Sequence, residues 1–318
     1  MSYTETIKEE ISYIKSTKSE MIAELSGFVR NNATFIDGSL SLTTENTDIL
    51  NRVKTFLKTL YNVDADITVI DNLNFSKKDL YSITFEEHQE KILKALAYND
   101  EDNEFIKVPP TYIVGGNEEI RAYLRGVFFS SGSVNDPKTS RYHMELLISN
   151  PDEAVFIQKM LNIFDLNAKI LNREKGYMIY IKEAEKISDY LKILGATKAV
   201  LYYENVRVYR DQKNKTNRLN NCEQANIDKV FLTASNQLRD IEKIIAYDLL
   251  DVLDQKLKEV VEFRQKYPES SLQELSEIMS RELGYTITKS GLNHRFRKLK
   301  DMVSHLEDKK VYDENTYL

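Results

Sequence analysis

Apolar residues recur at helical spacing in two stretches that share an unusual feature, a glycine in the middle of the helix. The stretches are LSGFVRNNA (residues 25–33) and LRGVFFSSG (residues 124–132). A glycine inside a helix costs about 1 kcal/mol relative to alanine, so Gly27 and Gly126 need a compensating reason. Close approach of a second backbone is such a reason, and Ser130, one turn after Gly126, is also small. Unless these are two unrelated amphipathic helices, the pattern predicts that they pack together at Gly27, Gly126 and Ser130.

The same order of elements follows each of these helices. After the first, the periodicity predicts strands at 34–36 and 40–44, a helix at 48–61, strands at 65–70 and 80–85, and a helix from residue 86. After the second, it predicts a strand from residue 132, a strand at 142–149, a helix at 151–164, strands at 168–173 and 177–181, and a helix at 183–194. A repeated order within one chain indicates two related halves. Residues 3–19 predict one further helix on the first half.

The last third of the chain predicts helices. Helical periodicity covers residues 227–247 and 253–267, and Pro268 ends the second of these helices. The sequence SLQE at 271–274 is a capping box that begins a third helix, which Gly284 ends. A fourth helix follows from residue 289, and its buried stripe is predicted to be Leu292, Phe296, Leu299, Val303 and Leu306.

The other face of the fourth helix is basic. Residues 289–300 contain five Lys and Arg and no acid. Two helices joined by a short turn, the second basic and rich in Asn and Arg near its start, are typical of a helix-turn-helix that enters the major groove. Arg can read guanine and Asn adenine, whereas Lys and His neutralise phosphates. The alternative is an amphipathic helix whose charged face is only solvated. The predicted DNA contacts are Lys289, Ser290, Asn293, His294, Arg295, Arg297, Lys298 and Lys300.

A second basic segment precedes these helices. Residues 199–209 resemble a strand, and residues 207–218 carry five basic residues and one acid, interleaved with Asn, Gln and Thr. Such a segment can lie along a phosphate backbone and become ordered there, or it can be a solvated linker. Its candidate DNA contacts are Arg207, Arg210, Lys213, Lys215 and Arg218.

Composition narrows the class of protein. A chain of 318 residues with 42% hydrophobic and 30% charged residues predicts two or three globular domains. The net charge of −6 argues against nucleic acid, but the acidic excess lies in the first 110 residues, and local concentration of positive charge decides phosphate binding.

Residue types that bind metals or form disulfides are sparse. One Cys and four scattered His exclude a disulfide framework and a Cys/His zinc site, so we expect no metal and no cofactor. No signal peptide and no apolar run of membrane-spanning length is visible, which predicts a cytoplasmic, nucleoid-associated protein with no membrane partner.

The two glycine-containing helices resemble the paired motifs of the LAGLIDADG homing endonucleases, in which each half contributes an interface helix and a saddle of antiparallel strands that grips DNA. The resemblance implies an α+β fold with two pseudo-symmetric αββαββα halves that form a saddle, followed here by an all-α helix-turn-helix domain. In that family the eighth motif position is a carboxylate that binds the catalytic metal, and Asn32 and Ser131 occupy it here. Because Mg²⁺ needs hard, negatively charged oxygens, the resemblance implies the scaffold and argues against a nuclease.

The chain as a whole closely resembles the WhiA family of Gram-positive bacteria. The resemblance rests on LRGVFFSSGSV (124–134), NRLNNCEQAN (217–226), SLQEL (271–275) and TKSGLNHRFRKL (288–299). It implies a non-enzymatic protein that binds double-stranded DNA and regulates transcription, in sporulation in filamentous members and in cell division and chromosome segregation in others. The connection at 281–286 is longer than in the family pattern.

The expected organisation has five parts. Residues 1–110 form the first half with its N-terminal helix, 111–200 the second half, 201–225 a basic Asn/Arg-rich linker, 226–310 the helical DNA-binding domain, and 311–318 a tail.

Two other functions stay open at this point. The first-half strands carry more acid than base, which suits a saddle that binds another regulatory or division protein, with DNA binding as a chromosome tether. The residues are Asp37, Asp64, Asp66, Asp71 and Asp79 against Lys77 and Lys78. A residual metal-dependent endonuclease would need carboxylates that have moved, and the nearest acids downstream of the motifs are Asp37 and Asp136.

Overall fold

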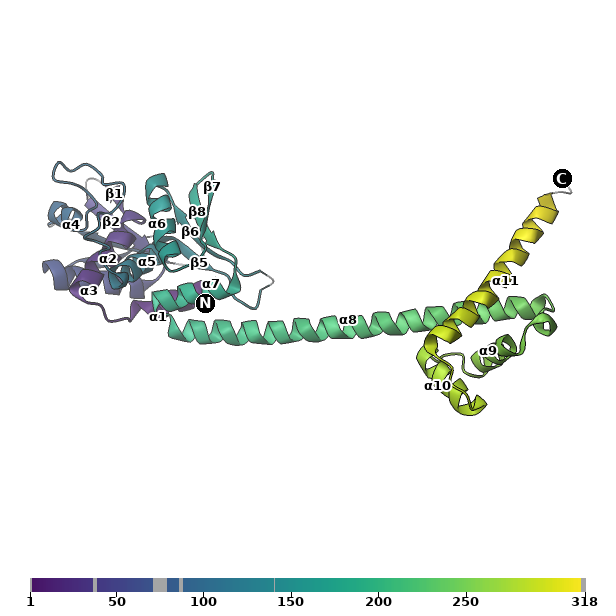
Figure 1. Cartoon of the computed structure of the whole chain (residues 1–318). Coiled ribbons are helices and arrows are strands. Elements are labelled where there is room, and N and C mark those ends of the chain that lie inside the picture. Colours follow the sequence, from purple (N-terminus) through teal and green to yellow (C-terminus); the bar gives the residue numbers. More distant parts are fainter. Residues whose placement is uncertain (1, 37–38, 71–78, 86–87, 140, 316–318) are drawn as a thin grey trace. The chain divides into compact units, whose positions relative to one another are not determined.

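The computed structural model describes residues 2–36, 39–70, 79–85, 88–139 and 141–315. They form two compact units, Met1–Asp211 and Gln212–Leu318. Figure 1 shows both units and labels most of their helices and strands. In the part of the chain that the structure describes, no helix combines the length and the apolar character needed to cross a membrane.

The first unit contains the same series of elements twice (Figure 1). The first series is α1 (Tyr3–Ser12), α2 (Lys18–Arg30), β1 (Thr34–Ile36), β2 (Ser39–Thr44), α3 (Thr47–Tyr61), β3 (Asp66–Ile70), β4 (Leu80–Phe85) and α4 (Gln89–Ala95). The second is α5 (Asn117–Ser131), β5 (Gly132–Val134), β6 (Met144–Ile148), α6 (Pro151–Ile163), β7 (Lys169–Arg173), β8 (Gly176–Ile181) and α7 (Ala184–Leu194). The predicted α+β class with two related halves is confirmed. The helix predicted over 3–19 is divided, because α1 ends at Ser12 and a capping box of Thr17 and Glu20 begins α2.

The two sheets have the same topology. The strand orders are β1-β2-β4-β3 and β5-β6-β8-β7, and every pair is antiparallel. Leu42 pairs with Ile83 in the first sheet and Leu146 with Ile179 in the second, and all four side chains are fully buried. Because successive side chains alternate between the faces of a strand, each sheet turns one apolar face to the core and leaves the other for the saddle.

The central helices α2 and α5 touch backbone to backbone. A Cβ atom on Gly126 would lie 2.0 Å from the carbonyl oxygen of Glu24, and one on Gly27 would lie 2.4 Å from that of Tyr123. Both distances are below any real van der Waals contact, so only glycine fits at this crossing. Ser130, one turn after Gly126, is half-buried. Its hydroxyl donates to the carbonyl oxygen of Val127 on its own helix at 2.8 Å.

A buried ion triad fixes the two halves next to this crossing. The carboxylate of Glu24 on α2 accepts hydrogen bonds from Arg52 Nε on α3 at 2.5 Å and from Arg125 Nε on α5 at 2.8 Å. All three side chains are at most 7% exposed. Each guanidinium also donates to backbone carbonyls, Arg52 to that of Ser12 and Arg125 to that of Leu194. Such satisfied geometry is what makes a buried charge tolerable.

The strand predicted for residues 199–209 was wrong. These residues and the basic segment predicted as a linker, residues 201–225, lie in one helix, α8 (Thr197–Ala246). Ala199 and Tyr203, one helical turn apart, are buried against the first unit. The carboxylate of Glu10 accepts hydrogen bonds from the backbone N–H groups of Lys198 and Ala199, which caps the start of the helix.

The second unit is a small helical domain. It contains the C-terminal part of α8, a 3₁₀ turn η1 (Leu250–Val252), and the helices α9 (Gln255–Lys266), α10 (Leu272–Leu283) and α11 (Lys289–Asn315). The capping box of Ser271 and Glu274 and the left-handed Gly284 limit α10 as the sequence predicts. The final helix continues through residues 311–315, which we expected to be a tail.

Candidate nucleic-acid interface

The helix α11 is held by an apolar stripe and begins at a cap. Leu292, Phe296, Leu299 and Val303 are at most 5% exposed and belong to the core of the second unit. The hydroxyl of Thr288 accepts the backbone N–H of Gly291 at 3.1 Å, which fixes the first turn. The connection from α10 to α11 therefore runs over residues 284–288. The apolar stripe of α11 faces the core, and the side chains outside the stripe are mostly exposed.

Six predicted DNA contacts lie together on the face of α11 opposite the apolar stripe. At 100° per residue, the six span about 140° of the helix circumference, centred away from the stripe. They are Lys289, Ser290, Asn293, His294, Arg297 and Lys300, and all are exposed except Asn293, which is half-buried. Lys298 is exposed at the edge of this face. The arrangement presents positive charge and base-reading side chains from one side of one helix.

Arg295 does not share this face. Its guanidinium lies 4.0 Å from the carboxylate of Glu259 on α9, and its side chain is only 17% exposed. Tyr285 donates to the same carboxylate at 2.5 Å. Because Arg295 faces α9 and the connection before α11, its position fits a role in orienting α11 within the domain and not a contact to bases.

The predicted basic segment divides into two groups. Arg207 forms ion pairs with Glu185 at 3.5 Å and Glu204 at 3.1 Å. Arg210 donates to the carbonyl oxygens of Pro137 and Thr139 and lies over the ring of Tyr142. These two residues attach α8 to the second half of the first unit.

The other group consists of Lys213, Lys215 and Arg218, and all three side chains are exposed. Sequence reasoning missed a further member of this surface, Lys229. At 100° per residue, Lys215, Arg218 and Lys229 fall within about 60° of one another on α8. A helix predicted over residues 210–229 would have revealed this spacing, but Lys215 and Arg218 were assigned to a linker and Lys229 to the helix after it.

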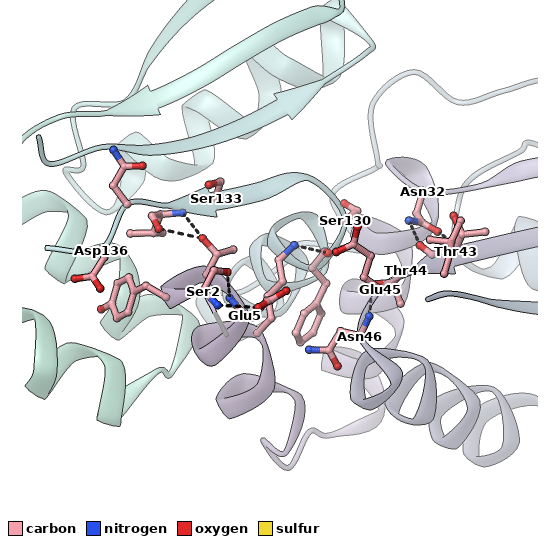
Figure 2. A pocket seen from close by; sticks show the side chains of 17 residues that line it. Ser2, Glu5, Asn32, Thr43, Thr44, Glu45, Asn46, Ser130, Ser133 and Asp136 are labelled. Carbon is pink, nitrogen blue, oxygen red and sulfur yellow. Dashed lines mark hydrogen bonds between the residues drawn. The ribbon is translucent and has the colours of Figure 1, made fainter. Parts of the chain in front are cut away.

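The positions of the endonuclease carboxylates hold side chains whose hydrogen bonds are internal. Asn32 donates to the carbonyl oxygen of Thr43 at 2.7 Å and accepts its N–H at 2.8 Å. Ser131 donates to the carbonyl oxygen of Val127 at 3.1 Å. Asn32 from the first half and Ser130 from the second line a cavity of about 760 Å³ (Figure 2).

Lys8 supplies a positive charge to this cavity. Its ammonium donates to the carbonyl oxygen of Phe129, near the end of α5, at 2.9 Å. Burial lowers the pKa of Lys8 to about 8, and the nearby carboxylates of Glu45 and Glu5 oppose this shift. The amine is therefore mostly protonated at neutral pH, and a cation at this place stabilises the helix end and repels a divalent metal.

Of the two carboxylates considered for a displaced nuclease site, the structure describes Asp136. Asp136 lines the cavity, accepts the hydroxyl of Tyr202 at 3.1 Å and caps the backbone of Lys138. Asp37, like Asp71, Lys77 and Lys78, lies outside the described residues. Within the described ranges there is no group of three His, Cys, Asp or Glu residues placed to hold a metal ion.

The saddle face of the first sheet is mainly hydroxylated, whereas that of the second sheet combines leucines with the exposed side chains of Lys169 and Arg173. In the second sheet the register places Leu147, Met178 and Leu171 in one row, and the two leucines are each 42% exposed. In the first sheet Thr43, Ser82 and Thr68 form the corresponding row. These rows offer surface for side-chain packing and hydrogen bonding.

Comparison with known proteins gives the family of each part of the chain. Residues 18–97 match the model of the WhiA N-terminal LAGLIDADG-like domain, residues 120–213 that of the WhiA LAGLIDADG-like domain, and residues 216–303 that of the WhiA C-terminal HTH domain. The third match begins in α8, so the C-terminal part of this helix belongs to the helix-turn-helix domain.

Relatives match over nearly the full length. The chain is 39% identical to a probable cell division protein WhiA of Enterococcus faecalis, with 97% of this chain and 99% of that protein covered. It is 38% identical to the protein of the same name of Exiguobacterium sibiricum, with 97% and 98% covered. The crystal structure of full-length WhiA from Thermatoga maritima is similar with a TM-score of 0.58 at 21% identity, covering 96% of this chain and 99% of that one, which shows the shared fold.

Proposed function

This chain belongs to the WhiA family, and on that premise we propose that it is a non-enzymatic DNA-binding protein that regulates transcription in cell division and chromosome segregation. In this proposal the helix-turn-helix domain reads double-stranded DNA. The name of these relatives, probable cell division protein, supports a role in cell division.

The observation that carries the proposal is the basic outer face of residues 289–300 in α11, a stretch without an acid that Asp301 follows. Lys289, Arg297 and Lys300 surround Asn293 on a helix whose other side is buried in the domain core. A helix that is held by its apolar side and exposes Arg and Asn is suited to the major groove, where each bidentate contact contributes about 1–3 kcal/mol of discrimination.

Binding of the full chain to genomic fragments at several salt concentrations tests this proposal. We expect a preference for some fragments and a plot of log affinity against log salt with a slope of about −0.9 per neutralised phosphate. No binding to any fragment at low salt would contradict the proposal.

We propose no nuclease activity because the two motif positions lack the chemistry for it. Both polar atoms of the Asn32 side chain are engaged with Thr43, and Lys8 supplies a cation to the same cavity. We expect supercoiled plasmid to stay intact with the protein and Mg²⁺. Nicking that requires Mg²⁺ and is lost on Asp136→Asn would overturn this part of the proposal.

A second function is favoured by the saddle itself. We propose that it binds another regulatory or division protein, because Leu147 and Leu171, which flank the buried Met178 in the second sheet, are apolar and each 42% exposed. The variant Leu147→Asp with Leu171→Asp should lose a protein partner in cross-linking while keeping its affinity for DNA. Loss of DNA affinity in this variant would instead place DNA on the saddle.

A further inference from the structure

A second cavity, of about 230 Å³, lies within the helix-turn-helix unit. It is lined by Lys229 and Thr233 of α8, by the first residues of α10, by Arg264 of α9 and by Lys289 of α11. The cavity therefore joins the basic side of α8 to the first residue of α11, two surfaces that are distant in sequence. Its volume is several times the roughly 30 Å³ that a water molecule occupies in the liquid, which leaves room for a small polyatomic group.

The cavity contains a buried positive charge that lacks an anionic partner. Arg264 is 0% exposed. One of its terminal nitrogens donates to the carbonyl oxygens of Ser270 at 2.6 Å and Tyr267 at 3.3 Å, while its Nε has no hydrogen-bond partner. Burial lowers the pKa of Arg264 to about 10, so it stays protonated at neutral pH. Among the described residues, no carboxylate lies within ion-pair distance of it. A buried guanidinium in this state favours a bound anion.

The start of α10 adds donors to the same cavity. The capping box uses the N–H groups of Ser271 and Glu274, whereas those of Leu272 and Gln273 belong to the first turn and have no partner within the helix. The positive end of the helix dipole also favours negative charge there. The carboxylate of Glu274 is engaged with Ser271 and is not part of the cavity lining.

We propose that this cavity holds one phosphate group of the DNA backbone while α11 lies in the groove. The inference rests on the proposed function, since it assumes that the domain binds a duplex. Lys229 and Lys289 supply mobile charges, the first turn of α10 supplies fixed donors, and the buried Arg264 adds positive charge behind them. A phosphate held there sets the register of α11 on the duplex. From this phosphate, the DNA backbone continues along Lys215 and Arg218 of α8.

The variant Thr233→Glu in the full chain tests the proposal. Thr233 is exposed and lines the cavity, so a carboxylate at this position competes with a phosphate while the domain core stays intact. Asn236→Glu is the charge-matched control, because residue 236 is exposed on the same helix and does not line the cavity. For Thr233→Glu we expect roughly tenfold weaker binding to preferred and random duplexes alike and a salt slope smaller by about 1.

A second variant removes a donor without adding charge. Lys229→Ala should also lower the salt slope by about 1, and Lys229→Arg should restore it. The proposal is overturned if Thr233→Glu loses no more affinity than Asn236→Glu, or if the slope of Lys229→Ala equals that of the wild type. Because the wild-type chain is measured in the same series, failure of the proposed function appears separately, as a wild type that binds no duplex.

A free phosphate is the other source of the same chemistry. At fixed ionic strength, inorganic phosphate in place of chloride should weaken duplex binding by the wild type more than by Thr233→Glu. If Thr233→Glu instead binds duplex like the wild type and only its sensitivity to inorganic phosphate is lost, the cavity takes a free anion, and the assignment to the DNA backbone is wrong.

Discussion

The crossing of α2 and α5 predicts a large effect of a single added methyl group. In Gly126→Ala the new Cβ atom would lie 2.0 Å from the carbonyl oxygen of Glu24 and 2.8 Å from the backbone nitrogen of Phe28. Real contacts of this kind do not fall below 3.0 Å, so the helices must separate by roughly 1 Å. The obstacle is backbone on the partner helix, which cannot rotate away as a side chain can.

The cost follows from the balance of two effects. Overpacking costs about 1–3 kcal/mol, and a rigid obstacle places this case at the upper end. The helix propensity of alanine returns up to about 1 kcal/mol. The expected net loss of about 2 kcal/mol corresponds to roughly 30-fold more frequent opening of the first unit at 1.36 kcal/mol per decade.

Amide hydrogen exchange measures this effect for each unit separately. Peptides from α2 and α5 of Gly126→Ala should exchange roughly 30-fold faster than those of the wild type, while peptides from α9 to α11 stay unchanged. Gly291→Ala is the matched control, since its Cβ would lie 3.2 Å from the hydroxyl of Thr288 at an exposed helical position. It should leave stability equal or raise it by up to about 1 kcal/mol. Wild-type protection of α2 and α5 in Gly126→Ala would refute the reasoning.

Two further predictions concern buried charges of the first unit. Glu24→Ala leaves Arg52 and Arg125 buried and unpaired, so urea unfolding of the first unit should show a loss of about 3–5 kcal/mol, and a loss below about 1 kcal/mol would contradict the triad. Burial raises the pKa of Glu153, a buried acceptor for the hydroxyl of Tyr123 at 2.7 Å, so the folded state binds its proton more tightly than the unfolded state. Protonated Glu153 therefore contributes its full stability below pH 4.5, the ordinary pKa of a glutamate. This contribution is lost as the pH rises toward the higher pKa that Glu153 has in the folded state. Glu153→Gln should remove that slope and be at least as stable as the wild type at pH 7, and an unchanged pH profile would contradict this account.

The elements that the sequence predicts well are those whose signals are local. The capping box at Ser271, the terminal Gly284 and the stripe from Leu292 to Val303 depend on residues a few helical turns apart, and the structure agrees with them. The side chain of Leu306, also predicted for the stripe, lies outside the described residues. The repeated order of elements also needs only local patterns, compared across the two halves of the chain.

The start of α8 was predicted as a strand because its local sequence favours a strand over a helix. The sequence VRVY at 206–209 alternates β-branched and aromatic residues with polar ones, which favours a strand. Tertiary packing decides instead, since Tyr203 is buried one turn after Ala199 and Glu10, 188 residues earlier, caps the helix. Propensity is a weak guide where distant residues supply the cap and the packing.

The candidate site was predictable only as a list of charges. The sequence shows that Arg207, Arg210 and Arg295 are basic, but their partners, among them Glu185 and Glu259, come from other elements. The same limit hid Arg264, whose role depends on a cavity between four helices. Tertiary contacts decide which basic residues are accessible to DNA.

The central claim is that α11 reads bases, and the Arg297→Ala variant of the full chain tests it most directly. Its affinity for a site selected from genomic fragments is compared with that for a scrambled duplex of equal length. Because Arg297 is exposed at the middle of the basic face, the account predicts a loss of about 1–3 kcal/mol on the selected site and a much smaller loss on the scrambled duplex. Equal losses on both duplexes, or no loss on either, would contradict base reading by this helix.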